Sequence, residues 1–206
     1  MIGNFRYTKT VLLWGFVFVA VYMLGAAIDA TNISGTCMFI LMPYFAAFAV
    51  TYPILALGRF GTGFLIYLPY AVLGFFPLYY FDWLGSGALV GLWAVFLFSA
   101  TGPLTGMFLD LTMLLAARLP VPYRAILLGV VMQALTFVTM LLGLTYLYVP
   151  SAAGVGHLHF FSREWFFTLP WMILNGAFGG YTAHALLSLR SERLQSQALD
   201  RKRSTA

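Results

Sequence analysis

The sequence predicts an all-α fold: a polytopic membrane protein with six transmembrane helices in one bundle. Three observations predict it. Of the 206 residues, 62% are hydrophobic and 8% are charged, whereas soluble domains carry about 25% charged residues. Aromatic residues reach 18%, which is typical of proteins with aromatic belts at the membrane interfaces. The apolar residues gather in long runs, and about 20 apolar residues in a helix suffice to cross a membrane.

Six apolar runs follow one another along the chain, and each predicts one helix. The first is longer than the apolar core of a signal peptide, so we interpret it as a retained helix. The fourth run is about 33 residues long and contains Pro103, so it fits either one kinked helix or two short spans. The predicted ranges are 11–28, 35–57, 61–80, a segment within 85–117, 125–148 and 165–189.

The placement of the basic residues favours six spans over seven. With six spans and a cytoplasmic N-terminus, only Arg163 of the 11 Lys and Arg residues falls on the outer side, as the positive-inside rule requires. Splitting the fourth run would move the basic C-terminal tail to the other side. We therefore expect a transmembrane domain over 1–190 and a basic cytoplasmic tail over 191–206, with both termini in the cytoplasm of a multi-pass cell-membrane protein.

The same topology places most polar side chains in the outer loops, where they are candidate ligand contacts. Asp82 and Trp83 lie in YYFDWLGSG, which reads as an aromatic belt or as a recognition loop in which the acid pairs with a ligand and the indole stacks on it. The stretch 149–164 is the longest predicted loop. It contains His157, His159 and Glu164. This stretch fits a lid over an outer cavity, or the two histidines form a metal site with Glu164 or Asp82 as the third ligand.

Asp110 is a carboxylate inside the fourth apolar run. Gly102, Gly106 and Asp110 are spaced by four residues and share one helix face, and small residues let a second helix approach closely. A carboxylate at the centre of a membrane helix costs at least about 2.5 kcal/mol, so it must face protein or water. Asp110 is therefore either a ligand contact inside the bundle or a structural hydrogen-bonding residue.

The last predicted helix reads WMILNGAFGGYTAHALL and contains the GxxxG pair Gly176 and Gly180. Such a pair indicates tight helix packing. Trp171 and Asn175 lie nearer the predicted outer end and are candidates for the wall of a ligand cavity.

The sequence contains no pattern typical of a known catalytic site. HExxH, GxSxG and Walker motifs are missing, and the single cysteine, Cys37, rules out an intramolecular disulfide or a cysteine cluster. We therefore expect neither an enzyme nor a bound cofactor, and no nucleic-acid partner, because the membrane topology accounts for the net charge of +5.

Three segments resemble the substrate-binding S components of energy-coupling factor (ECF) vitamin transporters. They are RFGTGFLIYLPYAVLG (59–74), ATGPLTGMFLDLTMLLAAR (100–118) and ILNGAFGGYTAHALL (173–187). The resemblance implies a small vitamin-like substrate bound at the outer face, with uptake driven by a membrane coupling subunit and two ATPases. It also implies that small residues of the first helix meet the coupling subunit. Here these are Gly15, Ala20 and Gly25, which are five residues apart where the family has four.

Two other interpretations remain open on the sequence. The chain fits a non-catalytic subunit of a larger membrane complex, and PLTGMFLDLTMLLAAR also resembles a helix in the A subunits of copper membrane monooxygenases. A metal-dependent membrane enzyme that uses the two outer histidines is the third interpretation.

Overall fold

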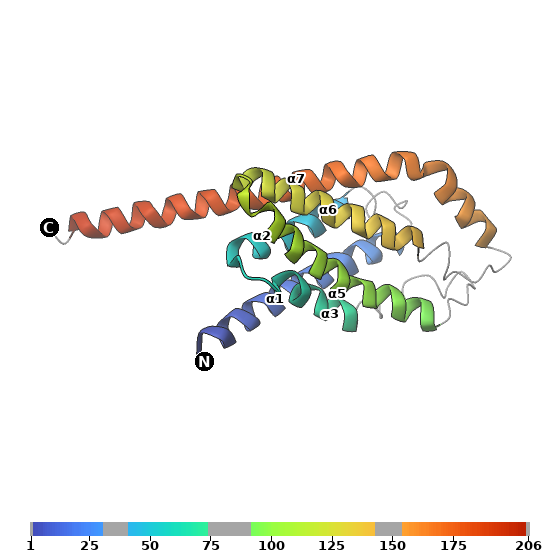
Figure 1. Ribbon diagram of the computed structural model, residues 1–206, viewed down its shortest axis with the longest axis horizontal. Coiled ribbons are helices and arrows are strands. Elements are labelled where there is room, and N and C mark those ends of the chain that lie inside the picture. Colours follow the sequence, from blue (N-terminus) through green and yellow to red (C-terminus); the bar gives the residue numbers. More distant parts are fainter. Residues whose placement is uncertain (1, 31–40, 74–91, 143–153, 205–206) are drawn as a thin grey trace.

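The computed structural model describes residues 2–30, 41–73, 92–142 and 154–204, and the regular structure in these ranges is helical throughout. The helices lie roughly along one direction, and α7 extends far past the others at the end where both termini lie (Figure 1). The predicted all-α class is confirmed. The described elements are α1 (Ile2–Ala30), α2 (Met42–Leu57), α3 (Thr62–Leu73), α5 (Leu92–Leu115), the 3-10 turn η2 (Ala116–Arg118), α6 (Val121–Leu142) and α7 (Gly154–Ser204).

Two described segments, Arg6–Leu24 and Val121–Thr139, are long and apolar enough to cross a membrane. The described parts of α2 and α3 are apolar but shorter. Only 22% and 33% of the two long segments are buried inside the protein. Their apolar side chains therefore face outward to a large extent, unlike those of a core helix in a soluble protein, which must be covered.

The fourth predicted helix is continuous over its described part. α5 runs from Leu92 to Leu115 with Pro103 inside it, which confirms one helix in preference to two short ones across this proline. A proline removes one hydrogen bond of the helix, and neighbouring helices can compensate for that loss.

The turn between α2 and α3 depends on two glycines with positive φ. Gly58 (φ 57°) ends α2 in the left-handed conformation, and its N–H donates to the Ile54 carbonyl at 3.0 Å. Gly61 has φ 89°. Residues with a side chain rarely adopt these angles, which makes glycine the natural choice at both positions. The hydroxyl of Thr62 then donates to the Arg59 carbonyl at 2.6 Å as α3 begins.

The connection between α5 and α6 is held by an arginine. The Nη2 atom of Arg124 donates to the carbonyls of Ala117 and Leu119, at 2.6 and 3.0 Å. The last carbonyls of a helix have no partner within it and carry partial negative charge, so a guanidinium group at this end is favourable.

α7 begins earlier than the sequence predicted. The interpretation of 149–164 as a loop is wrong from Gly154 onward, because α7 starts there. Between Pro150 and Pro170 the sequence has no proline, and extending an existing helix adds one hydrogen bond for each residue that is fixed. At the other end, α7 runs without interruption across the predicted domain boundary at 190/191 to Ser204.

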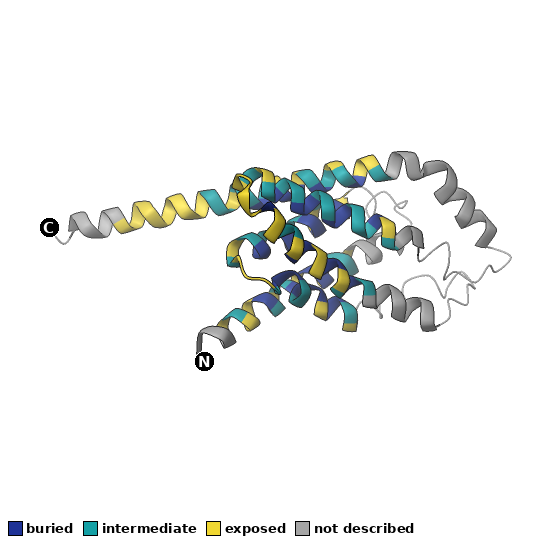
Figure 2. Ribbon diagram, viewed as in Figure 1, coloured by how far each residue is buried: buried dark blue, intermediate teal, exposed yellow. Residues whose placement is uncertain are grey.

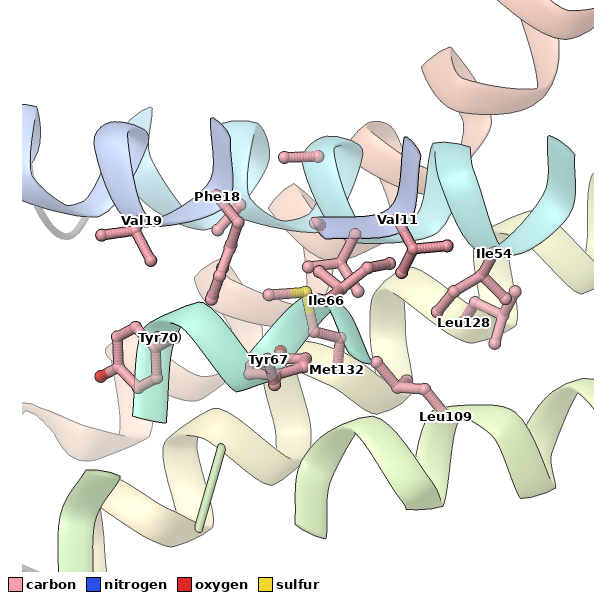
Figure 3. Packing of buried hydrophobic residues seen from close by; sticks show 14 residues of the cluster. Val11, Phe18, Val19, Ile54, Ile66, Tyr67, Tyr70, Leu109, Leu128 and Met132 are labelled. Carbon is pink, nitrogen blue, oxygen red and sulfur yellow. The ribbon is translucent and has the colours of Figure 1, made fainter. Parts of the chain in front are cut away.

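The core lies where the inward faces of the helices meet (Figure 2). α6 packs most extensively against α7, α3 against α5, α2 against α7 and α1 against α3. Figure 3 shows Phe18 of α1, Tyr67 of α3 and Met132 of α6 converging in this core. Gly15 faces α3, where an added Cβ would lie 2.6 Å from the Ile66 carbonyl oxygen. This small residue of α1 therefore serves packing within the chain.

Basic side chains gather at one end of the bundle, which we call the basic end. The start of α1, the α2–α3 turn, the α5–α6 connection and the C-terminal part of α7 all lie there (Figure 1). Two of its arginines contact tyrosines: the guanidinium carbon of Arg59 lies 5.0 Å from the ring centroid of Tyr7, and Arg190 donates to the Tyr52 hydroxyl at 3.3 Å. The described basic residues of this end are Arg6, Lys9, Arg59, Arg118, Arg124, Arg190 and Arg193.

Candidate functional site

Asp110 binds the start of a neighbouring helix. Its Oδ1 accepts the N–H of Gly63 at 2.9 Å, and its Oδ2 accepts the N–H of Phe64 at 3.1 Å. The first N–H groups of a helix have no partner within that helix and carry partial positive charge. Asp110 of α5 therefore caps α3 from the side. Both carboxylate oxygens are engaged and the residue is 2% exposed, so the contacts support the structural interpretation of Asp110.

The predicted face of α5 that carries Gly102, Gly106 and Asp110 does turn toward α3. A Cβ on Gly106 would collide with the backbone of Gly63, and a Cβ on Gly102 would lie 2.9 Å from the Tyr70 ring. The two glycines let α3 and α5 approach closely enough for Asp110 to reach the amides. The sequence prediction that this stripe brings a second helix within hydrogen-bonding distance is confirmed.

A cavity of about 100 Å³ lies where all six described α-helices meet. Its aromatic wall comes from α1 and α3, which contribute Phe18, Tyr22, Tyr67 and Tyr70. The ring centroids of Phe18 and Tyr67 are 4.9 Å apart and those of Tyr22 and Tyr70 are 5.3 Å apart, with the rings meeting edge to face. These contacts fix the rings relative to one another.

The rest of the cavity wall contains methionines and a few polar groups. Met42, Met132 and Met172 line it, and unbranched methionines adapt easily to the shape of what they contact. The amide nitrogen of Gln133 donates to the Pro43 carbonyl at 2.6 Å, which fixes this buried side chain between α6 and α2. The remaining polar lining consists of threonine hydroxyls from α5 and α6.

Tyr67 combines burial with an unmet hydrogen bond. The residue lines the cavity and is 3% exposed. Its hydroxyl has no hydrogen-bond partner in the described part of the chain. A buried hydroxyl without a partner costs about 1–3 kcal/mol relative to one in water. No contact among the described residues offsets this cost.

The sequence-predicted site residues of the last helix lie beside the cavity, not on its wall. Trp171 is 44% exposed, and the side-chain amide of Asn175 donates to the Trp171 carbonyl at 3.0 Å. Met172, the residue after Trp171, lines the cavity in its place. Consecutive residues differ in this way because a shift of one residue turns a side chain by about 100° around the helix.

The other predicted contacts cannot be placed in this cavity. Asp82 and Trp83 lie outside the described residues. His157, His159 and Glu164 lie in the first turns of α7, and the structure does not describe their side chains. The two histidines therefore lie in a helix, where the prediction had a strand or a loop. No group of three or more metal-ligating side chains occurs among the described residues.

The aromatic wall was missed by sequence reasoning, although a signal was present. Phe18 and Tyr22 are four residues apart, and Tyr67 and Tyr70 are three apart, so each pair shares a helix face. Two such aromatic pairs, one on α1 and one on α3, form an aromatic cluster when the two helices pack against each other.

No family model matches the chain, and neither a curated protein nor a solved structure matches it.

Proposed function

We propose that this chain is an integral membrane protein that binds a small solute within its helix bundle, as the solute-binding subunit of an uptake transporter. The observation that carries the proposal is the cavity at the meeting point of the six described helices. Ligand sites in helical bundles commonly form between facing helices. An apolar cavity with a few fixed polar groups suits a small molecule better than an ion.

The membrane part of the proposal is supported by the outer surface of the bundle. Large apolar side chains are exposed on all of the described α-helices, which in water would make the protein aggregate. In lipid, the same side chains are solvated by hydrocarbon. The list includes Leu13 and Phe16 of α1, Phe45 of α2, Leu68 and Val72 of α3, Leu104 and Phe108 of α5, Val138 of α6, and Leu174 and Phe178 of α7.

The basic end supports an orientation for the proposed protein. Clustered arginine and lysine side chains favour the cytoplasmic side of a membrane, so the proposal is a multi-pass protein of the cell membrane with both termini in the cytoplasm. The resemblance to ECF S components adds that a separate coupling subunit and ATPases supply the energy for uptake. The substrate in this proposal is a small vitamin-like molecule.

The test compares two alanine-to-leucine variants of α2. Ala46 is buried and lines the cavity, whereas Ala56 is exposed on the same helix. The full chain is purified in mild detergent, and small molecules released by denaturation are identified by mass spectrometry. We expect a stoichiometric small molecule in the wild type and in Ala56→Leu, and its loss in Ala46→Leu, since leucine fills part of the cavity.

The outcome that contradicts the proposal is equally specific. If wild-type protein releases the same molecules as Ala46→Leu in the same amounts, the cavity holds no solute. Both variants are checked for a single symmetric peak in size-exclusion chromatography, so that loss of the molecule reports on the cavity and not on misfolding.

A further inference from the structure

We propose that the flank formed by α1, α2 and α7 at the basic end binds one anionic phospholipid, whose phosphate is held by Arg190 and Arg193. The inference rests on the membrane location within the proposed function and goes beyond the solute site. The residues that carry it do not line the cavity. α2 lies at the centre of this flank, because it packs against both α1 and α7.

Arg190 lies beside α2, short of the end of that helix. The hydroxyl of Tyr44 donates to the Thr182 hydroxyl at 3.1 Å, and eight residues further along both helices Arg190 donates to the Tyr52 hydroxyl at 3.3 Å. α2 and α7 therefore run in the same direction. Since α2 continues for five residues beyond Tyr52, to Leu57, this contact lies about 7.5 Å inside its end. The exposed guanidinium group is thus open to the side of the bundle.

The guanidinium group of Arg190 has unused donors. It carries five N–H groups, and its contact with another described side chain is the one with Tyr52. Arg193 is three residues further along, on the same side of α7, and is also exposed. Within the described part of the chain, no ion pair joins either arginine to a carboxylate, including the neighbouring Glu192. Guanidinium groups bind phosphate through two parallel hydrogen bonds, so this pair suits a phosphate group.

An aromatic patch of Trp14, Phe48 and Tyr52 adjoins Arg190. The ring centroid of Trp14 lies 5.1 Å from that of Tyr52 and 6.5 Å from that of Phe48. All three side chains are partly exposed. Tryptophan and tyrosine favour the level of the lipid headgroups in membrane proteins. The patch therefore supports a headgroup level beside Arg190.

Exposed apolar side chains continue from the patch away from the basic end. Val17 is three residues after Trp14 on α1, and Phe45 is three residues before Phe48 on α2, so each shares a helix face with its aromatic neighbour. They are 40% and 44% exposed. Both lie deeper than the patch, because α1 starts at the basic end and α2 ends there (Figure 1). An acyl chain can follow this apolar surface, which favours a phospholipid over a soluble anion or an acidic protein segment.

The charge of the flank selects among phospholipids. The headgroup of phosphatidylcholine carries an ammonium group next to its phosphate, and two arginines without a carboxylate partner repel that cation. Phosphatidylglycerol carries the phosphate without a cation. An anionic phospholipid therefore fits this flank better than a zwitterionic one.

The test is native mass spectrometry of the full chain, purified in mild detergent and titrated with phosphatidylglycerol or with phosphatidylcholine of the same acyl chains. A detergent micelle has no charged bilayer surface, so binding reports on the protein itself. We expect the wild type to bind phosphatidylglycerol about tenfold more tightly than phosphatidylcholine, and Arg190→Gln to lose about tenfold in phosphatidylglycerol affinity, as for one charged hydrogen bond.

Arg118→Gln is the matched control. It removes the same charge from the same end of the bundle, where Arg118 is exposed in the connection between α5 and α6. This variant should change phosphatidylglycerol affinity by about twofold or less, because distant exposed charges are screened. A large excess of glycerol phosphate, which is the headgroup anion without acyl chains, should not displace the bound phosphatidylglycerol from the wild type.

Three results overturn the inference. Equal affinity for the two lipids removes the preference for an anionic headgroup, and equal losses in Arg190→Gln and Arg118→Gln show diffuse attraction in place of a site. Displacement by glycerol phosphate shows a site for a soluble anion. All three differ from failure of the solute site, which the comparison of Ala46→Leu with Ala56→Leu measures. If the chain stays soluble and monodisperse without detergent, the membrane location fails and this inference fails with it.

Discussion

Replacing Asp110 by alanine tests the side-on cap of α3 directly. The substitution removes two hydrogen bonds from a charged acceptor, to the N–H groups of Gly63 and Phe64. Each such bond contributes about 1.5–3 kcal/mol, and the two amides are left buried without partners. Because the helices can relax slightly, we expect the free energy of unfolding to fall by about 3–5 kcal/mol, as on breaking a buried charged contact.

The asparagine variant makes this prediction quantitative. Asp110→Asn keeps one acceptor oxygen and loses the charge, so it should retain one weaker bond and lose about 1.5–3 kcal/mol. The order of stability is therefore wild type, Asp110→Asn, Asp110→Ala. Leu111→Ala, which truncates an exposed side chain on the same helix, serves as the matched control and should change stability by about 0.5 kcal/mol or less.

The measurement is reversible unfolding in mixed detergent micelles, followed by circular dichroism. If Asp110→Ala unfolds at the same denaturant fraction as Leu111→Ala, the carboxylate does not cap α3 and the explanation of its place in an apolar helix is wrong. If Asp110→Asn is as destabilised as Asp110→Ala, the bond does not depend on an acceptor oxygen as argued.

Three further changes probe the packing, the tail and the orientation. Gly129→Ala should destabilise the protein by about 1–3 kcal/mol in the same assay. The new methyl group collides with the Gly176 carbonyl and forces α6 away from α7. An unchanged stability would show that these helices can separate freely. Truncation after Arg190 should leave the unfolding midpoint unchanged, since the side chains described beyond it are exposed; a lowered midpoint would reveal contacts of the tail with the bundle. In a cysteine-free background, Phe60→Cys and Ser196→Cys should both react with a membrane-impermeant thiol reagent only after the cytoplasmic side is opened; reaction of either cysteine in intact cells would reverse the proposed orientation.

The helices and the Asp110 stripe could be predicted because their signals are local. A long apolar run indicates a helix without reference to its neighbours. Residues spaced by four share a face in any helix. This rule correctly predicted that Gly102, Gly106 and Asp110 lie on one face of α5. The start of α7 at Gly154 was missed because glycines and histidines were read as loop residues, whereas the absence of proline lets the helix continue through them.

The sequence by itself determined the all-helical class, the apolar character of the chain and the basic segments between the helices. Only the tertiary structure decided that Tyr67 and Tyr70 face a shared cavity while Trp171 faces outward, and that Asp110 binds amides of α3 in place of a solute. The physical reason is that these helices are apolar on all sides. A helix of a soluble protein marks its inner face by polarity. Here leucine and phenylalanine suit both the core and the outer surface, so the packing partners alone select the face that turns inward.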